Sequence, residues 1–200
     1  GTTVIANAFS LHINVGGPAY TAANGDQFSS DQYFLNGSTA GALQSIAGTA
    51  DSTLYSSERW AANLAYAIPL TEAADYRVTL YFAEIWSGAF APNKRVFDLT
   101  MEDSLYINDL DIYNEVGSKT AYQLTYTVAV NDGLLNVNTQ ASVNNAKLSA
   151  ISIEKVISTP SALPYLSAAA LNFNSNINAS LDSTLVYLVN PDTLAYPIDS

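Results

Sequence analysis

The chain has 200 residues, a length that suits one sizeable domain with or without a fragment of another. Its formal net charge is −11, with only seven Lys and Arg residues, so it repels nucleic-acid phosphates and anionic lipid headgroups, and we expect neither partner. There is no cysteine, which excludes disulfides, thiol catalysis and thiolate metal sites, and no apolar run is long enough to predict membrane insertion.

Alternation of apolar and polar residues with a period of two dominates the chain and predicts an all-β protein. In the first clear strand, Tyr76, Val78, Leu80 and Phe82 share one face. Further sets of the same kind follow in chain order: Phe97, Leu99 and Met101; Tyr122, Leu124, Tyr126, Val128 and Val130; Leu135 and Val137; Ile151 and Ile153. No segment has a convincing helical stripe. Many short strands with turn residues between them predict a β-sandwich with almost no helix.

A turn sequence, Asn131-Asp132-Gly133, separates two of these strands. Asp-Gly between alternating runs is a strong hairpin signal, because both central residues must accept positive φ. We therefore expect the strands that end at Val130 and begin near Leu135 to pair as a hairpin.

The composition changes at Ser158. Residues 158–164 are rich in Ser and Pro and predict a linker after a domain of residues 1–157. Residues 165–200 contain two further strand candidates, too few to bury a core alone. This short segment is either a partial β-domain or a set of strands that docks on residues 1–157 or on another copy, and Leu185, Val186 and Leu188 are the residues expected to be buried.

The low charged fraction, 12%, leaves Ser, Thr, Asn and Gln to form the polar surface. Such a surface favours a secreted or cell-surface protein that handles neutral polar ligands. Since small extracellular eukaryotic domains often rely on disulfides, a bacterial source is favoured. The chain opens with Gly1, which suits either removal of a signal peptide or trimming.

Catalytic and metal-binding signals are weak. The single histidine, His12, is accompanied by no nucleophile motif. Glycoside hydrolysis needs two facing carboxylates, and nothing in the sequence pairs the candidates Glu58, Glu84 and Asp98. Asn24-Gly25-Asp26 with Asp31 is oxygen-rich, but its spacing matches no EF-hand, so a solvated turn is favoured over a structural calcium ion. We expect no enzyme, no cofactor and no metal.

Aromatic residues give the stronger signal. Tyr33-Phe34, Trp60 and Trp86 lie where predicted strands end, and small residues follow both tryptophans. Sugar rings have apolar faces that stack on flat aromatic rings, and amide, acidic and hydroxyl side chains then bind the sugar hydroxyls. From the residues alone, a carbohydrate site and aromatic residues at the rim of the core are equally compatible with this pattern.

Six ordered motifs between about residues 4 and 156 resemble those of malectin domains. They are INVGG at 13–17, LYSSERW at 54–60, YFAEIW at 81–86, RVFD at 95–98, LDIY at 110–113 with Val116-Gly117, and NNAKLSAI at 144–151. The resemblance implies a jelly-roll β-sandwich of the galactose-binding type that binds carbohydrate and does not catalyse. The tail, from Leu171 through Ser183 to Asn190, weakly resembles the opening of a bacterial immunoglobulin-like repeat.

In the family, an α-linked diglucose unit is held by aromatic residues of three loops and an acidic residue near the last strand. Carried over by motif, these positions fall on Tyr33, Trp60, Trp86 and Asn144, with Phe34 as the alternative to Tyr33. Tryptophans stand where tyrosines are usual, Ser87 replaces an aromatic residue, and Asn144 replaces Asp. The expected ligand is therefore an α-glucan or another neutral, glucose-containing oligosaccharide, with a preference that differs from that of the animal lectin.

Two structural expectations complete the interpretation. Arg59 and Glu84 lie in family motifs beside the proposed ligand aromatics, so we expect them to form a buried ion pair, with Glu58 as the other acid able to neutralise Arg59. The alternative to a lectin is a structural subunit of an extracellular assembly, which would self-associate by lending strands of residues 165–200 to a neighbour.

Overall fold

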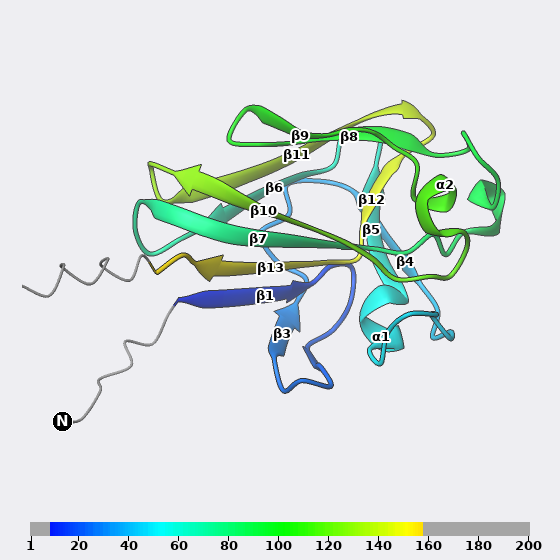
Figure 1. Ribbon diagram of the computed structural model, residues 1–200, viewed down its shortest axis with the longest axis horizontal. Coiled ribbons are helices and arrows are strands. Elements are labelled where there is room, and N and C mark those ends of the chain that lie inside the picture. Colours follow the sequence, from blue (N-terminus) through cyan, green and yellow to red (C-terminus); the bar gives the residue numbers. More distant parts are fainter. Residues whose placement is uncertain (1–8, 158–200) are drawn as a thin grey trace, which may run out of the picture. The chain divides into compact units, whose positions relative to one another are not determined.

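Two β-sheets packed face to face form the body of the part that the computed structural model describes, residues 9–157 (Figure 1). The larger sheet has the strand order β10-β7-β13-β1-β3-β2 and the facing sheet the order β6-β11-β8-β9. The strands of the larger sheet are β1 (Ser10–Asn14), β2 (Tyr20–Thr21), β3 (Gln27–Ser30), β7 (Ala74–Phe82), β10 (Tyr122–Val130) and β13 (Ala150–Lys155). Those of the facing sheet are β6 (Ala65–Pro69), β8 (Val96–Met101), β9 (Ser104–Leu110) and β11 (Leu134–Val143). Both the all-β class and the sandwich are as predicted.

The apolar face of each predicted strand lies between the two sheets. Tyr76, Val78, Leu80 and Phe82 of β7 are all fully buried, as are Phe97, Leu99 and Met101 of the facing strand β8. β7 pairs antiparallel with β10 on one side and with β13 on the other. The two sheets thus share one core, and the period-two patterns predicted these residues correctly because each strand has one face against it.

The predicted hairpin at Asn131-Asp132-Gly133 is wrong. β10 is an edge strand of the larger sheet, whereas β11 pairs with β6 and β8 in the facing sheet. The Asp-Gly turn therefore carries the chain from one sheet to the other. Gly133 still has the positive φ that the turn needs, and the Asp132 side chain accepts a hydrogen bond from the Leu134 amide at 2.9 Å. Of the two central residues, only Gly133 has the positive φ that the hairpin signal required, and local sequence does not show which strand becomes the partner.

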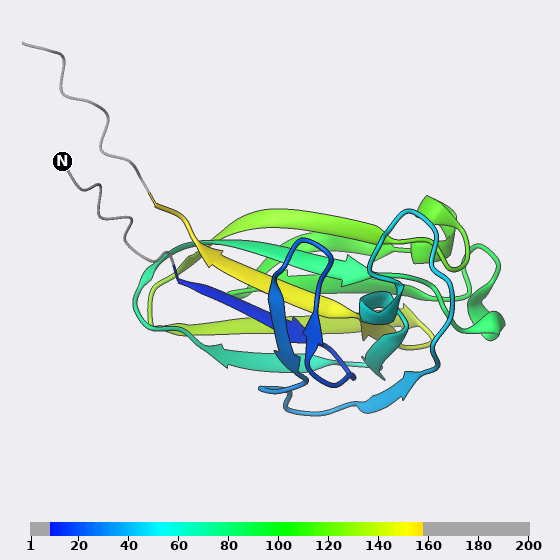
Figure 2. The same cartoon turned by 90° about the horizontal axis from the view of Figure 1, so that it is seen from below.

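A third, small sheet closes one end of the sandwich and positions the candidate site. Its order is β12-β5-β4, with β4 at Ser38–Gly41, β5 at Ser57–Ala61 and β12 at Ala146–Leu148. The helices are short: α1 (Ser52–Tyr55), α2 (Ile112–Val116) and the 3₁₀ turn η1 (Ser87–Ala89). Figure 2 shows α1 beside β5 at this end.

None of the helices in residues 9–157 is long and apolar enough to cross a membrane. The predicted linker (158–164) and the partial β-domain or docking strands (165–200), with Leu185, Val186 and Leu188, lie outside the described residues.

Gly16, in the loop after β1, fixes how closely this loop approaches β5. It has φ +70, and a Cβ added there would lie 2.2 Å from the Glu58 carbonyl oxygen. Gly25 also has a positive φ, +95, but nothing lies within 4 Å of its added Cβ. The two glycines therefore form a matched pair that separates backbone strain from a steric clash.

We expect Gly16→Ala to destabilise the fold by about 2–4 kcal/mol, and Gly25→Ala by about 1 kcal/mol, the cost of left-handed backbone alone. Chemical denaturation followed by tryptophan fluorescence measures both. Equal losses for the two variants would contradict the close approach of the Gly16 loop to β5.

Candidate functional site

Three of the four predicted ligand residues, Trp60, Trp86 and Asn144, line one pocket of about 390 Å³ at the end of the sandwich closed by the small sheet. The remaining lining residues are Ala40, Glu58, Arg95 and Asn145. A pocket of this volume is within the usual range for small-molecule sites. Residues from five separate stretches of sequence converge here, so the pocket is a product of the tertiary fold.

One face of the small sheet forms a wall of this pocket. β5 pairs with β4 and β12, and its register places Ala40 opposite Glu58 and Lys147 opposite Trp60. Because side chains alternate along a strand, Glu58 and Trp60 leave β5 on the same side, and residues opposite them share that side. Arg59, between them, leaves on the other side. The motif around Trp60 thus supplies the pocket with an aromatic ring and a carboxylate from alternate positions.

Trp86 follows β7 at the point where the chain turns into η1. It is 48% exposed, an unusual state for the largest side chain of a protein with a well-filled core. Its ring rests directly against Gly88, since a Cβ added to Gly88 would lie 2.2 Å from Cζ2 of the indole. Gly88 therefore leaves space for the indole ring. Trp86 also lines the pocket.

A buried ion pair holds the Trp86 segment in place. Glu84 Oε1 accepts a hydrogen bond from the Trp86 amide at 3.0 Å, and its Oε2 accepts one from Arg95 Nε at 2.7 Å. The Arg95 guanidinium also donates to the Asn145 carbonyl at 2.7 Å and lies 5.9 Å from the centre of the Trp86 ring. Burial of both charges strengthens these bonds, so the Trp86 turn and the Asn144-Asn145 turn are tied to the same side chain.

Asn144 lies in the turn between β11 and β12 with φ 62, a left-handed conformation that asparagine tolerates better than most residues. Its side-chain oxygen accepts a hydrogen bond from Asn145 Nδ2 at 3.0 Å, and its Nδ2 lies 3.5 Å from the Lys94 carbonyl, a weak contact. The exposed Asn144 amide therefore keeps hydrogen-bonding capacity toward the pocket.

Tyr33, the fourth predicted residue, does not line this pocket. Its carbonyl accepts a hydrogen bond from the Ala67 amide, and Phe34, the alternative, bridges to Tyr66. The Arg59 guanidinium lies 3.5 Å from the centre of the Phe34 ring. Since Arg59 leaves β5 on the side opposite Trp60, Phe34 belongs to that opposite side. The segment before Tyr33 has no motif to anchor its alignment, and the lining of this pocket does not support its predicted role in ligand binding.

The predicted Arg59–Glu84 ion pair is wrong, although both residues are buried as expected. Arg59 pairs with Asp31 at 2.8 Å and donates to the Gly37 carbonyl at 2.6 Å, whereas Glu84 pairs with Arg95. The alternating faces of β5 are the physical reason, because they send Arg59 away from the Trp86 side of the strand. Spacing along a sequence identifies a buried charge but does not identify its partner.

Asp31 has a second partner, the Tyr66 hydroxyl, at 2.9 Å. Burial, with the neighbouring Asp31 carboxylate adding to it, raises the pKa of Tyr66 well above its usual range. The hydroxyl therefore remains a hydrogen-bond donor to Asp31 at any ordinary pH.

The oxygen-rich loop is accounted for by its own contacts. Asn24 Nδ2 donates to Asp26 at 2.7 Å, and Asp31 is committed to Arg59 and Tyr66. Within residues 9–157, no three His, Asp or Glu side chains are grouped as metal ligands would be. His12 Nδ1 lies 2.8 Å from the Ser152 hydroxyl in the larger sheet and takes no part in the pocket.

Lys147 is the residue that the sequence interpretation missed most completely. It is fully buried, its Nζ lies 2.5 Å from Glu58 Oε2, and it also donates to the Ala83 carbonyl. A lysine between Ala146 and Leu148, in a segment that reads as a buried strand, is the signal that could have revealed it. Arg95 was likewise seen only as part of a motif.

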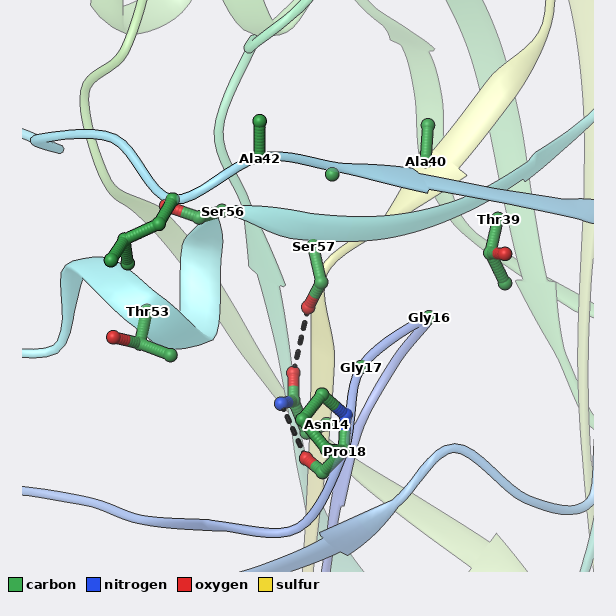
Figure 3. A pocket seen from close by; sticks show the side chains of 12 residues that line it. Asn14, Gly16, Gly17, Pro18, Thr39, Ala40, Ala42, Thr53, Ser56 and Ser57 are labelled. Carbon is green, nitrogen blue, oxygen red and sulfur yellow. Dashed lines mark hydrogen bonds between the residues drawn. The ribbon is translucent and has the colours of Figure 1, made fainter.

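A second cavity, of about 420 Å³, lies between α1, β4 and the loop after β1 (Figure 3). Ala40 lines both this cavity and the pocket of Trp60 and Trp86. The second cavity has no charged and no aromatic side chain in its lining. Ser57 donates to Asn14 at 2.9 Å, and Asn14 donates to the Pro18 carbonyl at 2.7 Å, so its floor is polar and already hydrogen-bonded.

A galactose-binding-like β-sandwich with exposed aromatic residues in an end pocket is the class that the fold and the site define. The malectin domain model matches residues 9–161, and the chain belongs to the malectin family, whose domains bind carbohydrate. It is 30% identical to malectin of Danio rerio over 157 residues, covering 74% of this chain and 53% of that protein. It is 31% identical to malectin of Homo sapiens over 147 residues, covering 68% and 48%. The chain thus spans about half the length of the curated relatives it matches.

Solved structures agree on the fold. A Bacteroides uniformis β-glucuronidase aligns with a TM-score of 0.66 and 18% identity, covering 74% of this chain and 18% of that one. The plant receptor-like kinase FER aligns with a TM-score of 0.65 and 19% identity, covering 74% and 50%. At these identities the likeness concerns the fold alone, and it confirms the β-sandwich.

We expect Asp31→Asn to destabilise the fold by about 3–5 kcal/mol, because it leaves the buried Arg59 cation without its counter-ion. Glu154→Gln is the matched control, since the Arg77–Glu154 pair is exposed to solvent and should contribute little to stability. Urea denaturation of both variants measures the difference, and equal effects would contradict the corrected pairing of Arg59.

We expect Gly88→Ala to displace the Trp86 ring, because the new methyl group would occupy the position of the indole. The indole N–H resonance and the fluorescence of Trp86 should change, while the unfolding midpoint changes little because the ring can move toward solvent. Gly48→Ala is the control, since its added Cβ meets only a Thr120 methyl group at 4.0 Å. An unchanged Trp86 signal in Gly88→Ala would contradict the contact.

Proposed function

We propose that this domain binds a neutral, glucose-containing oligosaccharide, such as an α-glucan, in the pocket of Trp60, Trp86 and Asn144, without catalysing its conversion. The observation that carries the proposal is the convergence of both tryptophans of the chain on one pocket, with one ring half exposed. Flat rings offer apolar area to the C–H faces of sugars, and each freezes only two torsions on binding.

The charges around the pocket support a neutral ligand. The cations and anions near it are matched one to one: Arg95 with Glu84, and Lys147 with Glu58. An anionic or cationic ligand would have to separate these buried pairs or remain unneutralised, and both cost free energy. Asn144 and Asn145 supply uncharged donors and acceptors that suit hydroxyl groups.

Two features argue for binding without catalysis. Glycoside hydrolysis needs two carboxyl groups on opposite sides of the scissile bond. Among the described residues that line the pocket, Glu58 is the only carboxylate, and it is already paired with Lys147. The family supports the same view, since its domains bind carbohydrate.

The cavity on the other side of Ala40 supports a ligand longer than one sugar unit. The two cavities share this small residue of the exposed strand β4, so a glycan in the aromatic pocket can extend across the strand. Hydroxyl-bearing and glycine residues line that extension, and they suit a hydrated sugar chain.

A secreted or cell-surface location, in a bacterium, remains part of the proposal. The sparse charge of the chain supports it. Among the solved structures of similar fold is the ectodomain of ANX1 from Arabidopsis thaliana, with a TM-score of 0.64, which is an extracellular use of the fold in that protein.

We expect Trp60→Ala and Trp86→Ala each to weaken glucan binding about thirtyfold or more, because truncating a central aromatic residue commonly costs about 2 kcal/mol. Calorimetry against maltose, nigerose and longer α-glucans measures the change. Tyr33→Ala is the control, since Tyr33 is 37% exposed but lies outside the pocket, and its affinity should match the wild type. Unchanged affinity in both tryptophan variants would contradict the site.

A further inference from the structure

Among the described residues that line the aromatic pocket, Glu58 is the only one with a carboxylate, and this carboxylate is buried. Its side chain is 4% exposed, and it shares a face of β5 with Trp60. Trp86, Asn144 and Asn145 line the same cavity. A ligand that stacks on the tryptophans is therefore placed directly beside this carboxylate.

Lys147 reaches the carboxylate from β12, the strand that pairs with β5 in the small sheet. Lys147 does not line the pocket, is fully buried, and places Nζ 2.5 Å from Glu58 Oε2. Replacing a buried ion pair by apolar residues of similar size is often neutral or stabilising. Stability alone is therefore a weak reason for a lysine and a glutamate at these two positions.

The hydrogen bonding of Glu58 is incomplete. Lys147 Nζ contacts Oε2 at 2.5 Å, and Oε2 is fully enclosed, so this oxygen is committed to the ion pair. Oε1 is not among the enclosed oxygens. An ionised carboxylate accepts up to about four hydrogen bonds, and buried polar groups are rarely left without one. Because Glu58 lines the pocket, the capacity that remains on Oε1 is open to a ligand there.

We propose that Glu58 is the residue that selects the hydroxyl pattern of the ligand: its Oε1 accepts a hydrogen bond from one sugar hydroxyl, while the ion pair of Oε2 with Lys147 holds the carboxylate in place. This inference rests on the proposed function. Bonds from hydroxyls to carboxylates are about twice as strong as neutral ones. Asn144 both donates and accepts, so it tolerates several hydroxyl arrangements, whereas a carboxylate accepts only and requires a donor in one place.

The selectivity follows from what happens when the hydroxyl is missing. A ligand with hydrogen at that position would leave Oε1 without a hydrogen-bond donor beneath the sugar ring, and sites built around such a bond reject the analogue strongly. Stacking on Trp60 and Trp86 does not discriminate in this way, because every pyranose offers an apolar face. The aromatic rings then provide contact area, and Glu58 provides the choice among sugars.

The test combines one double variant with monodeoxy analogues of the glucan that wild type binds best. Glu58→Gln alone would leave Lys147 buried without a counter-ion, so Glu58→Gln is combined with Lys147→Met, which removes both charges and keeps both shapes. Calorimetry is performed on the wild-type and the double-variant domain with the parent glucan and each analogue. Chemical denaturation checks that the double variant is folded.

For wild type, we expect one deoxy position to weaken binding tenfold or more. For the double variant, we expect the parent glucan to bind about tenfold more weakly, the loss of a charge-assisted bond, and the same deoxy position to have little further effect. Glu58→Asp, which keeps the ion pair but retracts the oxygens, should lose affinity for the parent glucan without losing the fold.

Equal binding of the parent and all analogues by wild type and double variant would show that Glu58 is only the counter-ion of Lys147, and would overturn the inference while leaving the proposed function intact. Should the double variant fail to fold, unchanged affinity of Glu58→Asp would overturn it equally. Absence of glucan binding by wild type would overturn the proposed function itself, and the inference with it.

Discussion

The arrangement of the site depends on the alternation of side chains along β5. Glu58, Arg59 and Trp60 are consecutive, and the strand sends the first and the third to the pocket and the second to the opposite side, where Asp31 neutralises it. The position of β5 is fixed further by its neighbours. It is the central strand of the small sheet, and Gly16 lies against the Glu58 carbonyl. A shift of one residue in its register would bury Trp60 beside Asp31 and turn Arg59 into the pocket.

Three buried cations at this end of the molecule bind backbone carbonyls in addition to their acidic partners. Arg59, Arg95 and Lys147 each pair with one acid and each also donates to a backbone carbonyl: Gly37, Asn145 and Ala83, respectively. They make up three of only seven Lys and Arg residues in the chain. Because a buried ion pair contributes little net stability, their common value lies in position: each joins a strand to a turn or a neighbouring segment beside the pocket.

How far the sequence predicts this structure depends on the distance over which each interaction acts. The strands Tyr76–Phe82 and Phe97–Met101 were predicted correctly because one face of each lies against a single core. The alternation of apolar and polar residues therefore shows which side chains are buried. The partner of Arg59 and the destination of the Asp132-Gly133 turn depend on which strands meet across the fold, and no local pattern contains that information.

The candidate site shows the same division. Trp60, Trp86 and Asn144 were brought to one place by motif order, whereas Lys147, Arg95 and the cavity beyond Ala40 were visible only in three dimensions. Lys147 is the most instructive of these, because its charge argues for an exposed position and its neighbours Ala146 and Leu148 argue for a buried one. A charged residue in a buried strand needs a partner elsewhere in the chain, here Glu58. Lys147 thus marks a position where the sequence departs from what packing alone would require.

The balance of charge near the pocket gives the acidic protein an uncharged binding surface. The net charge of −11 comes from acids outside these pairs, because Arg59, Arg95 and Lys147 cancel Asp31, Glu84 and Glu58 locally. The neutral sugar that we propose as ligand gains nothing from long-range attraction to such a protein, so its affinity would come from contact: ring area from the tryptophans and directed hydrogen bonds from the groups between them. The buried pairs make those contacts precise, since they fix the turns that carry Trp86 and Asn144 before a ligand arrives and so reduce the ordering that binding would otherwise require.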